Sequence, residues 1–149
     1  MAIGKLCVRE VAVAQRSTTV KEAAHLMRQF HVGNLVVVDG KGSRARPVGI
    51  VTDRDIVLSV VATGLDPAVF TLGDLTINAL VTCTEDQGVF ECIQQMRRHG
   101  VRRMPVVDRD GALVGIVAVD DLVQLLAEEM GELGKLIARE QAREALAKR

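Results

Sequence analysis

The sequence predicts a mixed α/β fold in which two β-α-β-β-α repeats pack through their sheets into one pseudo-two-fold body, followed by a C-terminal helix. Two repeated segments are the main observation. "VKEAAHLMRQFHVGNLVVVD" returns as "VFECIQQMRRHGVRRMPVVD", and "GIVTDRDIV" returns as "GIVAVDDLV". In both copies an amphipathic helical pattern comes before two β-rich runs. The chain has 149 residues, enough to bury one good core but few for two independent domains.

The first helix of each repeat is predicted from the spacing of its apolar residues. They fall at i, i+3, i+4 and i+7, which places them on one stripe of a helix. These residues are Val20, Ala23, Ala24 and Met27 in the first copy, and Val89, Cys92, Ile93 and Met96 in the second. A short strand is expected before each helix, "EVAVA" over 10–14 and "ALVTC" over 79–83.

Two β-rich runs follow each of these helices. "NLVVVD" and "PVGIV" in the first copy, and "RMPVVD" and "ALVGIV" in the second, are joined by turns that contain glycine, so each pair predicts a hairpin. A second helix is expected from about Thr52 in the first copy and from about Val119 in the second. Since neither repeat can cover its own sheet and helices alone, we expect the two to pack together.

The repeats divide the chain into four parts. We expect repeat 1 over 6–63, a linker over 64–75, repeat 2 over 76–127 and a helical tail over 128–149. Gly64 and Pro67 mark the linker because both residue types interrupt regular structure.

Composition argues against several classes of function. Nineteen basic and nineteen acidic residues give a formal net charge of zero, which does not favour a general nucleic-acid footprint. The chain has no Trp or Tyr and three Phe, too few for a platform that stacks bases. No segment has the length of a membrane span, and the N-terminus lacks the apolar run of a signal peptide. An odd number of cysteines, three, favours a reducing environment, so we expect a cytoplasmic protein.

The cysteines and histidines do not indicate catalysis or a metal centre. Cys92 lies on the apolar side of a predicted helix, where a buried thiol is expected, whereas Cys7 and Cys83 lie at predicted strand edges and could be exposed. A zinc site would require long-range convergence, because no short ligand spacing is present. The histidines are expected at the surface: His25, His31 and His99. No catalytic triad order, Walker A loop or dinucleotide-binding glycine pattern occurs, so an enzyme is not expected.

The repeated turn has a structural and a functional interpretation. Thr52 followed by Asp55 is the pattern of a capping box, which starts a helix. The same pattern places a hydroxyl and a carboxylate at a helix N-terminus, where they can bind a ribose or lie near a phosphate. In the second copy Ala118 replaces the hydroxyl, whereas Asp121 keeps the acid. The retained acid favours a ligand site over a cap alone.

Two tandem copies of this pattern, each ending in the turn that contains Asp55 or Asp121, resemble a pair of cystathionine-β-synthase (CBS) domains, also called a Bateman module. The resemblance covers about residues 6–127, and the length and linker are similar to those of small stand-alone bacterial CBS-pair proteins. It implies regulatory, non-enzymatic binding of an adenine-containing ligand, such as AMP, ADP, ATP or S-adenosylmethionine, and assembly as a homodimer. It implies no metal and no permanent cofactor.

The resemblance also implies two clefts between the repeats. The first would use Thr52 and Asp55 facing Thr76, Leu80, Val81 and Val101, with Gly33 and Asn34 near the phosphate. The second would use Asp121 facing Val11, Ala12 and Val32, with Arg102 and Arg103 near the phosphate. We therefore expect the clefts to be unequal, with the Asp55 cleft holding the nucleoside and the Asp121 cleft depending on phosphate charge.

The tail predicts a helix with an apolar seam. Leu126, Met130, Leu133 and Ile137 are spaced by four, three and four residues, close to the 3.5-residue period of a coiled coil. This seam is expected to add to the dimer contact made by the amphipathic helices of the repeats, or to contact another protein. The alternative function is therefore a structural or protein-interaction module with degenerate clefts that acts through its dimer surface and the C-terminal helix.

Overall fold

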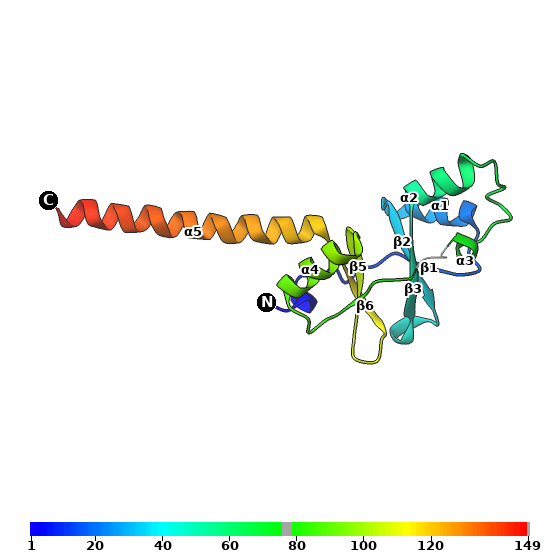
Figure 1. Ribbon diagram of the computed structural model, residues 1–149, viewed down its shortest axis with the longest axis horizontal. Helices are drawn as coiled ribbons and strands as arrows, with labels where there is room; N and C mark the ends of the chain where they lie inside the picture. The colour runs from blue at the N-terminus through cyan, green and yellow to red at the C-terminus, as the bar shows by residue number, and fades with distance from the viewer. Residues whose placement is uncertain (76–78, 149) are drawn as a thin grey trace.

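The computed structural model of the chain describes residues 1–75 and 79–148. Within these residues the strands form two three-stranded sheets, one from each repeat, which lie side by side with a long helix projecting from one end (Figure 1). The mixed α/β class and the order of elements predicted from the repeat are confirmed.

The first repeat forms a sheet in the order β1-β2-β3. The parallel pairing of β1 with β2 requires the crossover that α1 supplies, and the antiparallel pairing of β2 with β3 is the predicted hairpin. Its elements are β1 (Val13–Gln15), α1 (Val20–Phe30), β2 (Asn34–Asp39), β3 (Arg46–Thr52) and α2 (Asp53–Ile56), which continues as a π-helical turn over Val57–Val61.

The second repeat has the same topology, in the order β4-β5-β6. A short helix in the linker, α3 (Leu72–Leu75), precedes it. Its elements are β4 (Cys83–Thr84), α4 (Val89–His99), β5 (Arg103–Val107), β6 (Leu113–Ala118) and α5 (Val119–Ala147).

The predicted apolar stripes form the buried faces of α1 and α4, with one exception. Val20, Ala23 and Met27 are buried, whereas Ala24 is exposed because the buried face of α1 is narrower than the predicted stripe. Thr19 and Glu22 form a capping box that starts α1.

The strands before α1 and α4 are shorter than predicted and lie further along the chain. The sequence predicted strands over 10–14 and 79–83, but β1 begins at Val13 and β4 contains only Cys83 and Thr84. In the first repeat the carbonyl of Ala12 accepts a hydrogen bond from the backbone N–H of Val36 at 3.0 Å, so backbone pairing with β2 extends beyond β1. Val11 packs against the cluster between the sheets instead of continuing a regular strand.

The N-terminal segment packs on the second repeat before the chain enters the first sheet. The N–H groups of Ile3 and Gly4 donate to the carbonyls of Gln87 and Glu85, each at 2.8 Å. Val8 then pairs with Ile116 of β6. A Cβ at Gly115 would lie 2.6 Å from the Sγ atom of Cys7, so this close approach requires glycine.

The two sheets contact each other through a shared apolar cluster. Val36, Val38 and Ala45 of the first repeat are buried in it, and Leu113 and Ile116 of β6 pack against them. The N–H of Leu113 also donates to the carbonyl of Ala45 at 2.8 Å. The predicted packing of the repeats through their sheets is therefore confirmed.

All three cysteines are buried and free, so the prediction that Cys7 and Cys83 could be exposed is wrong. They share the core of the second repeat with Cys92, because the N-terminal segment brings Cys7 onto that core. Burial raises the pKa of the Cys7 thiol, and a hydrogen bond with Cys92, together with burial, raises the pKa of Cys83. Cys7 and Cys83 are therefore neutral thiols that behave as small apolar side chains.

The predicted surface positions of His25, His31 and His99 are observed. Among the described helices, none combines the length and apolar character needed to cross a membrane.

Candidate functional site

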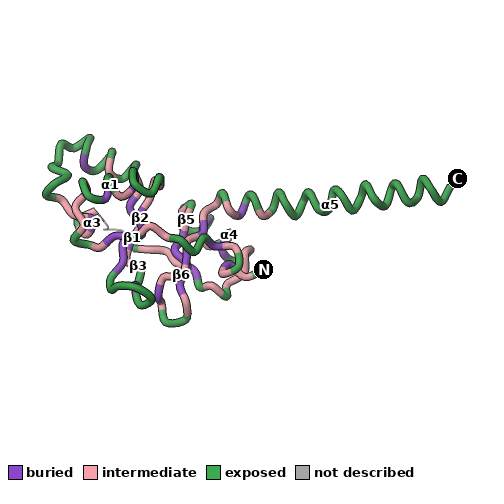
Figure 2. Tube along the Cα trace, turned by 180° about the vertical axis from the view of Figure 1, so that it is seen from behind, coloured by how far each residue is buried: buried purple, intermediate pink, exposed green. Residues whose placement is uncertain are grey.

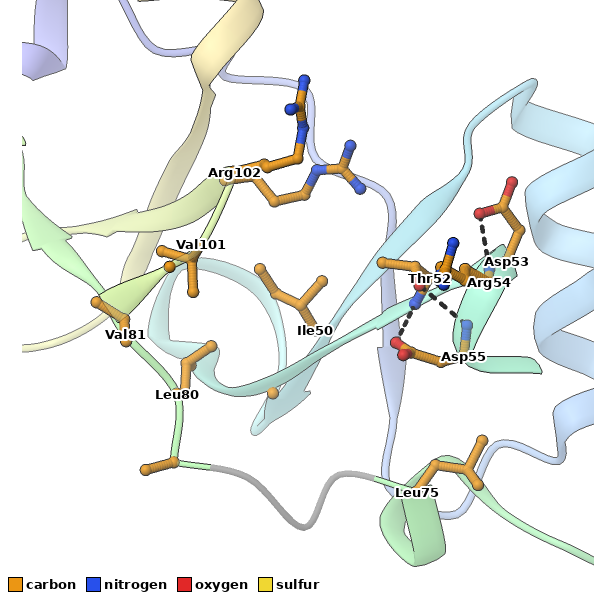
Figure 3. Close-up of a pocket in the computed structure, with 14 residues that line it drawn as sticks. Ile50, Thr52, Asp53, Arg54, Asp55, Leu75, Leu80, Val81, Val101 and Arg102 are labelled. Carbon is orange, nitrogen blue, oxygen red and sulfur yellow. Dashed lines mark hydrogen bonds between the residues drawn. The ribbon is translucent and has the colours of Figure 1, made fainter. Parts of the chain in front are cut away.

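A cavity of about 550 Å³ lies between the two repeats (Figure 3). This volume is within the range of ordinary small-molecule sites, which is about 300–1,000 Å³. Its walls come from β3 and α2 of the first repeat, and from the segments before β4 and β5 of the second. The lining residues are Gly49, Ile50, Thr52, Asp53, Arg54, Asp55, Leu75, Ala79, Leu80, Val81, Gly100, Val101, Arg102 and Arg103.

Thr52 and Asp55 form the polar wall, and they are held there by the start of α2. The Thr52 N–H donates to Oδ2 of Asp55 at 2.9 Å, and the Asp55 N–H donates to Oγ1 of Thr52 at 3.1 Å. The predicted capping box is therefore confirmed. It fixes the hydroxyl and the carboxylate at the cavity, so the structural role and a binding role use the same geometry.

Aliphatic side chains form the facing wall. Leu80, Val81 and Val101 come from the second repeat, and Ile50 of β3 lies between them and the polar turn (Figure 3). All four are partly buried. The cavity thus has an apolar side for a flat, weakly polar group and a polar side for hydroxyls.

Arg102 and Arg103 line this same cavity, although the sequence assigned them to the Asp121 cleft. The reason is the path of the chain. Gly100 and Val101 run along the cavity wall before β5 begins at Arg103, and Arg103 also pairs with Ala118 across β5 and β6. The two arginines consequently lie at the Asp55 cavity.

Arg102 has an exposed ionic partner. Its Nη2 atom lies 3.7 Å from Oδ1 of Asp120, and both side chains are largely exposed. An exposed pair of this kind contributes little to stability, because water and salt screen it. Arg102 can therefore exchange this partner for an anionic ligand at small cost.

Gly33 and Asn34 lie beside the Thr52 turn. Asn34 pairs with Thr52 across β2 and β3, and the Gly33 carbonyl accepts a hydrogen bond from the Asp53 N–H at 2.9 Å. A Cβ at Gly33 would lie 3.2 Å from Oδ2 of Asp53. Gly33 and Asn34 thus contact the turn, but they are not among the residues that line the cavity.

The second turn keeps half of the capping box. Oδ2 of Asp121 accepts a hydrogen bond from the Ala118 N–H at 2.8 Å. Ala118 has no hydroxyl to return a bond to the Asp121 N–H. The acid therefore caps α5 without a threonine partner, and its presence in the sequence has a structural explanation independent of any ligand.

The other residues predicted for the Asp121 cleft belong to the first repeat. Val11 packs against the cluster between the sheets, and Ala12 and Val32 pack against the core of the first repeat. A second cleft formed by these residues stays a prediction. Thr76, predicted for the first cleft, lies outside the described residues.

Sequence reasoning missed several lining residues. Ile50 precedes the predicted Thr52 by two residues, Arg54 lies between Thr52 and Asp55, and Leu75 belongs to α3 in the linker. Strand alternation places Ile50 on the same face of β3 as Thr52, a signal that was available. The position of Leu75 follows from the path of the linker, for which no local pattern exists.

The described residues contain no group of three or more His, Cys, Asp or Glu side chains placed to hold a metal ion. The residues that line the cavity offer hydroxyl, carboxylate, guanidinium and aliphatic groups.

The chain is therefore an α/β protein built from two tandem repeats, each with its own sheet, and a cavity lies between the repeats. The family model described as "CBS domain" matches residues 3–62 and 72–128. The chain belongs to the CBS domain family, as a tandem pair.

Three proteins illustrate what the chain is similar to. An uncharacterised protein of Methanopyrus kandleri is 34% identical over 84% of this chain, which spans only 62% of that relative's length. Hypoxic response protein 1 of Mycobacterium tuberculosis is 35% identical over 86% of this chain and 82% of its own. A CBS domain protein of Pyrobaculum aerophilum, solved in complex with AMP, has a TM-score of 0.73 and 28% identity, over 86% of this chain and 99% of its own.

Proposed function

We propose that this protein is a regulatory module that binds an adenine-containing ligand, an adenine nucleotide or an adenosyl compound, in the cavity between its repeats. The observation that carries the proposal is the arrangement of one cavity with an aliphatic wall opposite a rigid Thr–Asp turn and two arginines at its rim. Those three surfaces match the base, the ribose and the phosphate of a nucleotide.

The aliphatic wall is suited to the base. Leu80, Val81 and Val101 on one side and Ile50 on the other offer apolar surface to both faces of a planar ring. Burial of apolar area contributes about 25 cal/mol per Å², so this wall supplies affinity that does not depend on charge.

The Asp55 carboxylate is suited to the ribose. Its hydrogen bond to the Thr52 N–H uses Oδ2, and a carboxylate has about four lone-pair sites on its two oxygens. It can therefore keep the cap and still accept hydrogen bonds from two ribose hydroxyls. The Thr52 hydroxyl lies on the same wall, and is oriented by its bond from the Asp55 N–H.

Arg102 and Arg103 are suited to the phosphate. Hydrogen bonds between charged groups contribute about 1.5–3 kcal/mol each when well aligned. Because both arginines line the Asp55 cavity, we propose that this one cavity binds both the nucleoside and the phosphate, and that its affinity depends on phosphate charge. The AMP complex of the Pyrobaculum relative supports this class of ligand.

A thermal-shift screen tests the proposal. Full-length protein is heated with AMP, ADP, ATP, NADH or S-adenosylmethionine at millimolar concentration, and a ligand at 100 times its dissociation constant adds about 2.7 kcal/mol of stability. We expect a rise in melting temperature with at least one of them, and guanosine and uridine nucleotides serve as the matched controls. No shift with any adenine compound would overturn the proposal.

We further propose that the protein is a homodimer that uses the amphipathic helices of its repeats. Phe30 at the end of α1 and Phe90 on α4 are 53% and 76% exposed, and Val57, Leu58 and Val61 continue an exposed apolar surface after α2. Light scattering at micromolar concentration should give at least twice the chain mass of 16.1 kDa. A mass equal to that of one chain would contradict this assembly.

A protein-interaction module with degenerate clefts is the second candidate function. The observation that favours it is the exposed apolar surface of α5, which includes Met130 at 72% and Leu133 at 61% exposure. Loss of assembly on truncation after Glu128, together with no thermal shift from any adenine compound, would support this second candidate, whereas a thermal shift with an adenine compound would contradict it.

A further inference from the structure

The helix α5 carries a regular apolar face that the chain itself does not cover. Beyond Leu125 every described residue of the helix is exposed, and Figure 2 shows it projecting far beyond the body. We define the α5 seam as the four apolar residues spaced by four, three and four positions, which are Leu126, Met130, Leu133 and Ile137, with exposures of 48, 72, 61 and 55%.

A partner would stabilise such a helix, because most helical stability in proteins comes from packing an apolar face. Gly131 and Gly134 lie within the seam region, and each costs about 1 kcal/mol relative to alanine in a helix. A Cβ at either glycine would meet nothing within 4 Å in the single chain, so its own fold does not require them.

We propose that the α5 seam packs antiparallel against the α5 seam of a second copy of this chain. The spacing of four, three and four is the same in both directions, so two antiparallel copies bring their seams into register. Leu126 then faces Ile137 of the second copy, and Met130 faces its Leu133. The two-fold axis passes at the level of Gly131 and Glu132, midway between Met130 and Leu133 of the seam.

Charge decides the direction of the pairing, because a parallel pair would align the same seam equally well. The first part of α5, residues 119–134, has five acidic residues and no basic one. The described remainder, residues 135–148, has four basic residues and two acidic ones. An antiparallel pair places the acidic half of each helix beside the basic half of the other, whereas a parallel pair places acid beside acid.

Cysteine cross-linking tests the direction. Leu126→Cys and Ile137→Cys are made singly in the full-length protein, mixed, and oxidised; the wild-type protein, whose three cysteines are buried, is the background control. Antiparallel pairing predicts a disulfide between the two different variants. It predicts little cross-linking of either variant with itself, because equivalent positions are then about 16 Å apart at 1.5 Å per residue. Self-linking of each single variant would show a parallel pair, and no linking in any sample would show an unpaired seam; either result overturns the proposal.

A second pair of variants checks that the seam holds the helices together. Leu133→Glu places a charge in the seam, whereas Leu146→Glu places the same charge at an exposed position (67%) on another face of α5. We expect Leu133→Glu to lower the helical circular-dichroism signal and to abolish cross-linking in the cysteine variants, and Leu146→Glu to leave both unchanged. Equal effects of the two changes would contradict a specific seam. The adenine thermal shift should be the same in both variants, so a failed pairing is distinguishable from a failed ligand site.

Discussion

The carboxylate of Asp121 accepts a hydrogen bond from the backbone N–H of Ala118 at 2.8 Å. It repeats the bond that Asp55 makes to the Thr52 N–H at 2.9 Å. The acid of the repeated turn therefore has a structural role in both copies, and only the first copy adds the hydroxyl that completes the capping box. Only the first turn, moreover, lines the cavity with the two arginines.

The missing hydroxyl of the second turn gives a stability prediction. Ala118 has φ −115° and ψ 159°, close to the φ −106° and ψ 162° of Thr52, so Ala118→Thr places a hydroxyl where the backbone is already arranged to use it. We expect Ala118→Thr to raise, and Thr52→Ala to lower, the free energy of unfolding by about 0.5–2 kcal/mol. Urea denaturation measures both; a loss of stability in Ala118→Thr would show that the second turn excludes the hydroxyl sterically.

The arginines at the cavity give a specificity prediction. Arg103→Gln should weaken AMP binding by about tenfold or more and leave adenosine almost unchanged, since a charged hydrogen bond is worth about 1.5–3 kcal/mol. Competition calorimetry with the two ligands measures the ratio. Arg98→Gln is the matched control, because Arg98 is an exposed arginine on α4 outside the cavity lining. An equal loss for adenosine and AMP would mean that Arg103 supports the fold and does not contact phosphate.

The ends of α1 and α4 give a backbone prediction. His31 follows α1 with φ 53°, and Gly100 follows α4 with φ 64°, so both are in the left-handed region. A side chain at such a position costs about 1–2 kcal/mol, and glycine avoids that cost. His31→Gly should stabilise the protein and Gly100→Ala should destabilise it, each by about 1 kcal/mol in thermal unfolding. A destabilised His31→Gly would show that the imidazole makes a contact that offsets the strain.

The buried thiols give a reactivity prediction. Because burial raises the pKa of Cys7 and contributes to the raised pKa of Cys83, neither forms a thiolate readily in the folded protein at neutral pH. We expect Ellman's reagent to label none of the three cysteines rapidly in the native state, and all three after denaturation. Rapid native labelling of one thiol would show that the N-terminal segment opens from the second repeat.

Much of the fold could be predicted because its signals are local. The apolar stripe of α1, the hairpin of β5 and β6 and the Thr52 turn each follow from a few neighbouring residues. The placement of Cys7 could not be predicted in this way, because it depends on Val8 pairing with Ile116, a contact across more than a hundred residues of sequence.

The candidate site was predictable only in part, for the same reason. The polar turn and the aliphatic wall could be proposed from the sequence and the resemblance, and the structure brings Thr52, Asp55, Leu80, Val81 and Val101 to one cavity. The resemblance assigned the arginines to the other cleft. The residues around Arg102 and Arg103 do not show which turn the two arginines lie beside, because that depends on how the two repeats pack.

The most direct test of the ligand site is calorimetric titration of AMP into the wild-type protein, Asp55→Ala and Asp121→Ala. Both substitutions remove the same kind of bond to an N-cap N–H, so the Asp121 variant controls for the loss of a helix cap. We predict saturable binding to the wild-type protein, loss of that binding in Asp55→Ala, and its retention in Asp121→Ala. Wild-type affinity in Asp55→Ala would contradict the account, because the repeated acid would then be a helix cap and nothing more.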